Sequence, residues 1–415
     1  MGNVSAPAAL PFLKPDQVLE IAAMMTAKQR FLTALDCGVP DRLPVTTHHV
    51  MPYFLCKYMN GISNDEFFDY FGLDPIRWVS SEAPDPSRGQ RYGPEQEEPK
   101  AWFGGRWKAR HIETDTWRVE VQEITGQQYP MVRYRFLTPR GTLSMTLQFN
   151  EYTSWLIERP IKNARDIDLL GAFLPAPRCD VEGVNRAADE YGERGLVRSN
   201  IPTFEVFGQP GCWQDAACLV GIERLILATY DDPAWVHELL GILMRRKLAF
   251  IETMAGARFD LLELGGGDAS STVISPRLFD RFVAPYDSQL IAAAHAAGQR
   301  IVYHTCGGMM PILENIVAMG PDAIETLTPP AMGGDVDLAE ARRRLDNRVC
   351  FIGGFDQFHY FTGCTEAETR AAVRRCFAEA GAEGGYILCP SDHFFDADPA
   401  LIKAYADEAK QCRYG

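Results

Sequence analysis

The sequence predicts an α/β protein whose core is a closed (β/α)8 TIM barrel. Three observations predict this fold. Five strand–helix units follow one another in the second half, three further apolar strands precede them, and 415 residues suffice for one large barrel. We expect a single domain over 1–415, with an N-terminal extension over 1–26 and an antiparallel β meander inserted at about 100–160.

The first half supplies three of the eight expected barrel strands. Apolar runs predict strands over 43–49, 76–80 and 195–203, and a helix over 28–35 precedes the first of them. From about 100 to 160 the pattern changes to short alternating runs with turns at Gly126 and Gly141, which indicates antiparallel strands. These strands are expected over 116–121, 131–137, 143–149 and 153–158, and two helices follow around 212–229 and 233–254.

The second half alternates strand and helix. The expected strands cover 259–264, 300–304, 323–327, 349–352 and 386–389. The expected helices cover 275–297, 311–318, 338–345, 366–380 and 400–410, and the first of them is capped by Ser275-Pro276 and ended by Gly298. In a barrel of parallel strands, all C-terminal strand ends meet at one face, which is where the active site lies.

Composition and charge exclude several classes of function. The chain has 41 Lys and Arg against 55 Asp and Glu, so its net charge of -14 disfavours broad contact with nucleic acid or an anionic membrane. No apolar stretch approaches the roughly 18 residues of a membrane span, and the N-terminus lacks the pattern of a secretory signal. Eleven scattered cysteines suit a reducing compartment, so we expect a cytoplasmic protein.

Candidate metal ligands stand at the ends of expected strands. His304 and Cys306 end one strand, and residues two apart on a strand point to the same side. Cys389 ends the last strand, which closure of the barrel would bring near this pair. Three such ligands with one open position form the arrangement of a catalytic zinc site, and Glu263, near another strand end, could fill the fourth position.

Each of these features also has a simpler structural explanation. A single His-x-Cys occurs often by chance, and a cysteine in an apolar strand usually packs in the core. Glu263 is equally explained as a carboxyl group satisfied by backbone amides or by an arginine. The convergence of three soft ligands at the same end of separate strands is what favours zinc.

Longer passages of the second half resemble a known family. They are Glu263-Leu-Gly-Gly-Gly-Asp268, Tyr303-His-Thr-Cys-Gly-Gly-Met-Met-Pro311, Glu325-Thr-Leu-Thr-Pro-Pro330, Ile352-Gly-Gly-Phe-Asp-Gln-Phe-His359 and Cys389-Pro-Ser-Asp-His-Phe394. With these passages the chain resembles the zinc-dependent corrinoid methyltransferases of the uroporphyrinogen decarboxylase-like superfamily. Within that superfamily it is most similar to the substrate-demethylating enzymes of the O-demethylase branch.

The resemblance implies a TIM barrel that binds Zn2+ through His304, Cys306 and Cys389, with Glu263 as a fourth ligand that substrate can displace. It implies an enzyme that removes a methyl group from a small methylated substrate and passes it to the Co(I) corrinoid (cobalamin) of a partner protein. A methoxylated aromatic compound is the expected methyl donor. A Lewis acid or a proton donor must then stabilise the charge that develops on the leaving oxygen.

Further residues near the expected strand ends are candidates for catalysis and substrate binding. The catalytic candidates are Glu263, Asp392 and His393. The substrate-binding candidates are His48, Trp213, Phe355, Gln357, His359 and Phe394. A solvated loop explains Asp392 and His393 equally well, and ordinary core packing explains most of the aromatic residues.

Other functions remain open at this point. The same zinc site could hold a thiolate that accepts a methyl group from a methylated corrinoid, so the motif does not fix the direction of transfer. A uroporphyrinogen decarboxylase would use an arginine-rich N-terminal segment, whereas this chain has Thr46-Thr-His-His-Val50 after its first strand. A noncatalytic zinc- or corrinoid-binding scaffold would close its metal site with four protein ligands. A homodimer is also considered.

Overall fold

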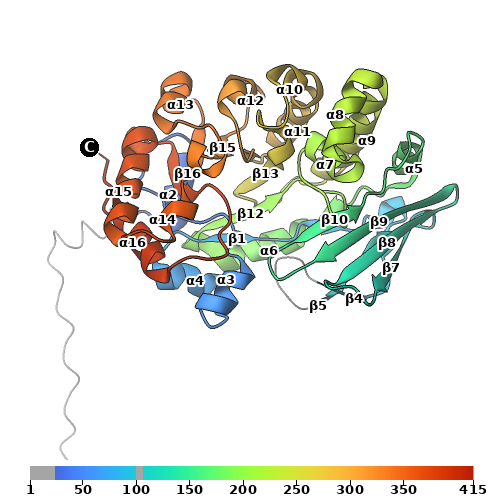
Figure 1. Ribbon diagram of the computed structural model, residues 1–415, viewed down its shortest axis with the longest axis horizontal. Helices are drawn as coiled ribbons and strands as arrows, with labels where there is room; N and C mark the ends of the chain where they lie inside the picture. Colours follow the sequence, from blue (N-terminus) through green and yellow to red (C-terminus); the bar gives the residue numbers. More distant parts are fainter. Residues whose placement is uncertain (1–23, 100–105, 415) are drawn as a thin grey trace, which may run out of the picture.

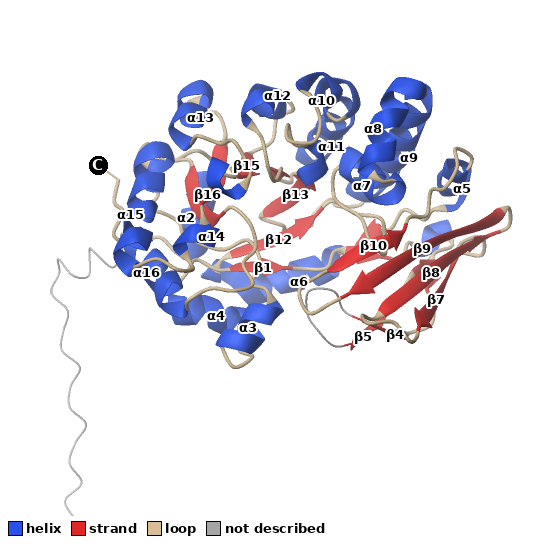
Figure 2. Cartoon of the chain, viewed as in Figure 1, coloured by secondary structure: helices blue, strands red, loops and turns tan. Residues whose placement is uncertain are grey.

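The computed structural model describes residues 24–99 and 106–414, so nearly all of the expected N-terminal extension lies outside the described residues. The central feature is a curled parallel sheet of seven strands, and helices surround it on the outside (Figures 1 and 2). Its order is β1 (Ile76–Trp78), β12 (Leu196–Asn200), β13 (Leu261–Gly265), β14 (Ile301–His304), β15 (Ala323–Thr326), β16 (Cys350–Phe355) and β17 (Tyr386–Pro390). Consecutive strands of the second half are neighbours, as strand–helix–strand units require.

The position of the eighth strand is occupied by a much shorter segment than the predicted 43–49. Val45 forms a single parallel bridge with Leu388 of β17, supported by hydrogen bonds from Thr46 N to Leu388 O and from Leu388 N to Pro44 O. On the other side, Asp74 N donates to Val45 O, just before β1. Pro44 has no N–H to add to a ladder, which limits the pairing. The sheet is therefore consistent with a TIM-like barrel, with this segment between its two edge strands.

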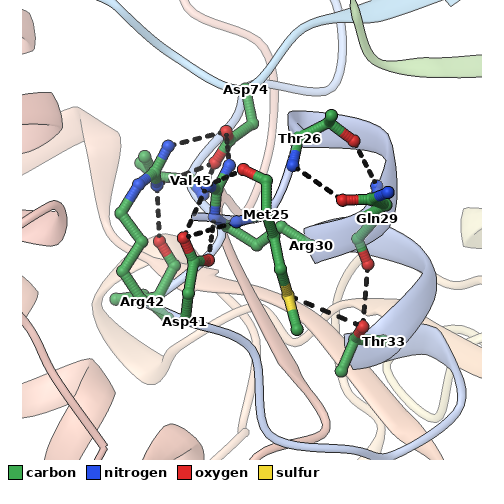
Figure 3. A network of polar contacts seen from close by, with 10 residues as sticks. Met25, Thr26, Gln29, Arg30, Thr33, Asp41, Arg42, Val45 and Asp74 are labelled. Atoms are coloured by element: carbon green, nitrogen blue, oxygen red, sulfur yellow. Dashed lines mark hydrogen bonds and ion pairs between the residues drawn. The ribbon is translucent and has the colours of Figure 1, made fainter. Parts of the chain in front are cut away.

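A buried ion-pair network holds the closing segment in place (Figure 3). The Asp74 carboxylate accepts hydrogen bonds from Arg30 Nη1 at 2.6 Å and from Arg42 Nη2 at 2.8 Å. It also accepts a bond from the backbone N–H of Val45 at 3.0 Å. Arg30 lies on α2 (Ala27–Leu35), which closes one end of the barrel, so the network ties that helix to the start of β1. Arg30 and Asp74 are both buried, so losing one partner would leave an uncompensated charge.

The predicted helices are found near their expected positions, with two interruptions, and five α-helices of the described residues have no predicted counterpart. The expected helix over 275–297 is two helices, α10 (Pro276–Phe282) and α11 (Ala284–Ala296), because Pro285 cannot donate to the preceding turn. The expected helix over 212–229 is broken at Gly221, whose φ of 99° is unsuited to other residues. The remaining helices are α3 (Pro52–Tyr58), α4 (Asn64–Phe71), α5 (Asp166–Phe173), α6 (Val181–Tyr191), α7 (Cys212–Val220), α8 (Ile222–Asp231), α9 (Pro233–Ile251), α12 (Leu313–Ala318), α13 (Leu338–Leu345), α14 (Gln357–Tyr360), α15 (Glu366–Cys376) and α16 (Pro399–Ala409).

An antiparallel sheet lies beside the barrel, in the order β10-β9-β8-β7 (Figure 1). Its strands are β7 (Arg118–Ile124), β8 (Met131–Thr138), β9 (Gly141–Phe149) and β10 (Ser154–Glu158). Residues alternate between exposed and buried along β8, so one face of the sheet packs inward. On that face, the ring of Phe136 lies 5.2 Å from the ring of Phe204 in the loop after β12. The sheet thus covers one side of the face that carries the C-terminal strand ends. A short antiparallel pair, β4 (Gln96–Pro99) and β5 (Arg106–Ala109), forms a separate two-stranded sheet.

Apolar side chains fill the barrel interior near α2. This cluster includes Leu196, Leu261, Val302, Ala323 and Ile387, one from each of five strands, together with Phe31 of α2. The next inward positions, two residues further along each strand, carry the polar groups described below. In the described parts of the chain, no helix combines the length and the apolar character that crossing a membrane requires.

Candidate active site

Polar side chains converge inside the barrel at the C-terminal ends of its strands. Arg198 follows Leu196 on β12 by two residues, and Glu263, His304 and Glu325 stand in the equivalent positions of β13, β14 and β15. His48, from the loop after the closing segment, joins them. Such a layer of charged groups above an apolar layer is costly unless each group finds partners.

Four of these residues form a compact group with ligand atoms within 4.8 Å of one another: His48, Glu263, His304 and Glu325. We call this group the polar cluster. His48 Nε2 lies 3.0 Å from Glu263 Oε2 and 3.3 Å from Glu325 Oε1. His304 Nδ1 lies 3.0 Å from Glu325 Oε1. Two imidazoles and two carboxylates at these distances offer the nitrogen and oxygen donors that a divalent ion takes.

Arg198 compensates the negative charge of the polar cluster. Its Nη2 donates to Glu263 Oε2 at 3.1 Å and also to Glu325 Oε1, while its guanidinium lies 4.7 Å from the ring of Trp78 on β1. Burial acts to raise the pKa of both carboxyl groups, but His304 beside Glu263 and Arg198 beside Glu325 outweigh it. Both pKa values therefore lie below their usual range, and both groups are carboxylates at neutral pH.

Cys306 extends the donor set on one side. Its Sγ lies 3.1 Å from His304 Nε2, as expected for residues two apart at a strand end. Burial acts against the charged form of His304, but Cys306 and Glu263 raise the pKa of its imidazole well above the usual range. Gly265 makes room for this strand end: its φ is 106°, and a Cβ there would lie 2.4 Å from His304 O.

Cys389 shares a small cavity with members of the polar cluster but is not one of the group. His48, His304, Cys389, Asp392 and His393 all line this cavity. The Cys389 side chain is buried, and burial raises the pKa of its thiol. Six of the sequence-predicted site residues are thus close to His304. They are Cys306, Glu263 and the four other residues of this cavity named above.

The donor set fits a zinc ion. Imidazole nitrogens, carboxylate oxygens and the Cys306 sulfur are the ligand types that zinc takes. Glu325 Oε2 is buried and has no hydrogen-bond partner among the described residues, which is unusual for a carboxylate oxygen away from water. An ion beside it would satisfy this atom.

A wider cleft leads to the polar cluster from the surface. It has a volume of about 670 Å³ and runs from His48, His49 and Trp78 toward α4 and α6. The ring of His49 stacks on Trp78 at 4.4 Å and lies 5.2 Å from His393. Burial, together with the neighbouring His48, lowers the pKa of His393 to about 4, so this ring is neutral at pH 7.

The other substrate-binding candidates lie elsewhere. Trp213, Phe355 and Phe394 are buried in the apolar core, and Trp213 Nε1 donates to Asp268 O. In this position the three rings contribute to the packing of the core, and their assignment to substrate binding stays a prediction.

The two polar substrate-binding candidates, Gln357 and His359, lie on the short helix that follows β16. Gln357 is buried and bonds the backbone of Ser391 and His393, which fixes the loop after β17. His359 points outward and pairs with Asp356 at 2.7 Å, on the first turn of α14.

Sequence reasoning missed two residues of the site, Arg198 and Glu325, and assigned His48 only to substrate binding. A signal for the first two is present in the sequence, because each is a charged residue at an inward position of a strand that begins with apolar residues. The sequence places His48 near the end of the first expected strand, but its contacts with Glu263 and Glu325 depend on closure of the barrel.

Comparisons with known proteins agree with this architecture. The family model described as uroporphyrinogen decarboxylase (URO-D) matches residues 132–412. A uroporphyrinogen decarboxylase of Thioalkalivibrio sulfidiphilus is 24% identical over 373 residues, which cover 84% of this chain and 98% of the relative. One from Chlorobaculum tepidum is 26% identical over 305 residues, covering 71% of this chain and 82% of the relative.

Among solved structures, a methyltransferase from Methanosarcina mazei superposes with a TM-score of 0.59 and 14% sequence identity. The match covers 93% of this chain and 99% of the methyltransferase, and at this identity it supports the fold alone. The match to the family model spans more than half of the chain and includes six of the seven strands of the parallel sheet together with most of the polar cluster. The chain therefore belongs to the uroporphyrinogen decarboxylase family.

Proposed function

We propose that this protein is a cytoplasmic, zinc-dependent methyltransferase that removes a methyl group from a small methylated substrate. The proposed donor is a methoxylated aromatic compound, and the acceptor is the Co(I) corrinoid of a partner protein. The observation that carries the proposal is the polar cluster at the C-terminal strand ends, with Cys306 in contact with His304. A donor set of this kind supports metal chemistry at the face where barrel enzymes bind substrate.

The residues of the chain have distinct roles in this proposal. His304 and Cys306 hold the metal together with Glu263 or Cys389, and His48 and Glu325 complete its surroundings. Zinc, when bound, supplies a Lewis acid for the negative charge that develops on the leaving oxygen. Arg198 holds the two carboxylates in place through its hydrogen bonds. Asp392 and the neutral ring of His393 line the adjacent cavity, where they can orient the substrate or accept a proton.

The relatives favour a second candidate, the decarboxylation of uroporphyrinogen, since the similar curated proteins carry that name. The charges around the polar cluster argue against it. A polycarboxylate needs cationic partners, but Arg77 is the one arginine among the described residues that line the cleft, and it is paired with Asp65 at 2.7 Å. Glu190 adds a further negative charge to the lining.

Methyl transfer to a Co(I) corrinoid, followed by the change in corrinoid absorbance, tests the proposal. The assay covers methoxyphenols, methoxybenzoates, methylamines and betaines, with and without a zinc chelator, and a parallel assay measures uroporphyrinogen decarboxylation. We expect transfer from a methoxylated aromatic compound that chelation abolishes. Transfer that survives complete zinc removal, or decarboxylation without transfer, would overturn the proposal. Methyl transfer from a methylated corrinoid to a small thiol would reverse its direction.

Cys306→Ser separates a catalytic metal from a structural one. We expect its zinc content to fall from about one ion per chain to a small fraction, while circular dichroism shows an unchanged fold, because the ligand lies at the functional face of the barrel. Cys56→Ser, at an exposed thiol on α3, is the matched control and should keep both zinc and activity. Loss of folded protein together with the metal would favour a structural scaffold.

A further inference from the structure

A second cavity lies under the antiparallel sheet, apart from the polar cluster. It has a volume of about 430 Å³, and it is bounded by the inward face of β8 and β9, by β4 and β5, and by the loop after β12. No residue that lines it belongs to the polar cluster or to the small cavity beside it. A volume of this size accommodates a one-ring organic molecule.

Aromatic side chains form much of the wall of this cavity. They are Trp107, Phe149, Phe204 and Phe207, with Leu147 and Val206 between them. Rings arranged around a cavity favour a flat apolar ligand, because aromatic groups pack well against one another in offset or edge-on geometry. The wall therefore suits an aromatic ring.

The floor of the cavity is a buried, paired group of charges. His111 Nε2 lies 2.7 Å from Glu98 Oε1, and the hydroxyl of Tyr134 donates to Glu98 Oε2 at 2.7 Å. The other imidazole nitrogen of His111, Nδ1, lies 3.3 Å from Glu205 Oε1. Burial acts against the charged form of His111, but its hydrogen bonds to Glu205 and Glu98 raise its pKa to about 10. One cation thus faces two carboxylates, so the floor carries a net negative charge at neutral pH.

Glu205 has one carboxylate oxygen that can accept a hydrogen bond from a ligand. Its Oε1 accepts from the backbone of Ile112 and contacts His111, whereas its Oε2 has no hydrogen-bond partner among the residues that the structure describes. The side chain is 15% exposed and lines the cavity. A ligand that donates a hydrogen bond would pair with this oxygen, and a carboxylate would be repelled by it.

We propose that this cavity is a separate binding site for a small aromatic molecule that carries a hydrogen-bond donor, such as a phenol or a benzylic amine, and no carboxylate. The wall supplies ring contacts, and Glu205 supplies the acceptor. Binding at this site requires neither zinc nor methyl transfer, so the test of this proposal does not depend on the proposed reaction.

Isothermal titration of the full-length protein with matched probes tests this site. Guaiacol has a ring with a hydroxyl group beside a methoxyl group, and 2-methoxybenzoate replaces that hydroxyl with a carboxylate. Methoxybenzene lacks the donor, and benzylamine tests an amine donor. We expect guaiacol or benzylamine to bind, and 2-methoxybenzoate and methoxybenzene to bind at least about tenfold more weakly.

Variants locate the binding. Glu205→Gln should weaken guaiacol binding about fivefold, because a charge-assisted hydrogen bond is roughly twice as strong as a neutral one. Trp107→Leu should weaken it about threefold, and this side chain is 47% exposed, so folding is not at risk. Glu120→Gln, at an exposed carboxylate of β7 paired with Arg135, should have no effect.

Cys306→Ser distinguishes this site from the polar cluster, where a methoxylated substrate would also bind. The titration is repeated on this variant, and guaiacol binding should persist there and still depend on Glu205. The proposal would be overturned if guaiacol binding disappeared in Cys306→Ser or stayed unchanged in both Glu205→Gln and Trp107→Leu. It would also be overturned if 2-methoxybenzoate bound as tightly as guaiacol. The absence of binding at millimolar concentrations would overturn it as well.

Discussion

His111 links protein stability to pH through a raised pKa. Its pKa is about 10 in the folded protein, against about 6.5 in an unfolded chain. A basic group whose pKa is raised by folding stabilises the folded state fully below its unfolded pKa, and this contribution disappears as the pH rises through the folded pKa. Through this residue alone, the free energy of unfolding should fall by about 2 kcal/mol between pH 7 and pH 9.

His111→Gln removes the titrating group while keeping a polar side chain beside Glu98. Urea unfolding followed by circular dichroism at pH 7, 8 and 9 gives the free energy of unfolding for both proteins. The wild-type protein should lose about 2 kcal/mol more than the variant over this range, because the contributions of groups remote from His111 cancel in the difference. Parallel pH dependence in the two proteins would refute the assigned charge of His111.

His237→Gln is a control in which folding shifts the pKa of the histidine in the opposite direction. Burial, together with Arg281, lowers the pKa of His237, so the folded state binds this proton less readily than the unfolded chain. The wild-type protein should therefore lose stability relative to this variant as the pH falls through about 6.5. From pH 7 to about 9 the free energies of unfolding of the two proteins should change in parallel.

Two further changes test the charges and the packing around the site. Arg198→Met leaves Glu263 and Glu325 without their buried cation and should lower the free energy of unfolding of the zinc-free protein by about 3–5 kcal/mol. Added zinc should restore part of this loss in urea titrations. Arg77→Met, which removes a partly exposed ion pair, is the control and should lower the free energy of unfolding by less than about 1 kcal/mol. Trp213→Ala empties a fully buried position and should cost about 3–5 kcal/mol, measured by the same titration. Unchanged stability with weakened substrate binding would instead assign Trp213 to the substrate.

Much of the fold could be predicted from local sequence. Strand–helix alternation in the second half, caps such as Ser275-Pro276 and the alternating runs before residue 160 all depend on neighbours a few residues away. The same holds for the proximity of His304 and Cys306, since period-two alternation is a property of a single strand. Where the predicted elements differed, the reason was also local: Pro285 and Gly221 interrupt helices, and Pro44 limits the eighth strand.

The composition of the site was predicted less completely. Sequence identified His304, Cys306, Glu263 and Cys389 as residues at strand ends, but it could not say which of their atoms approach one another. The structure joins Glu263 and His304 to His48 and Glu325, and it places Cys389 at the edge of the group, in the adjoining cavity. The role of Arg198 was not predicted from the sequence, because it depends on two carboxylates from other strands that lie beside it.

The sequence by itself determined which side chains face inward at the end of each strand, because that direction follows from the geometry of an extended backbone. Only the tertiary structure decided which of these side chains share one space, since the curl of the sheet and the bridge from Val45 to Leu388 bring His48 to residues more than 200 positions away. Distances between strand ends depend on how the whole sheet closes, and no short stretch of sequence contains that information.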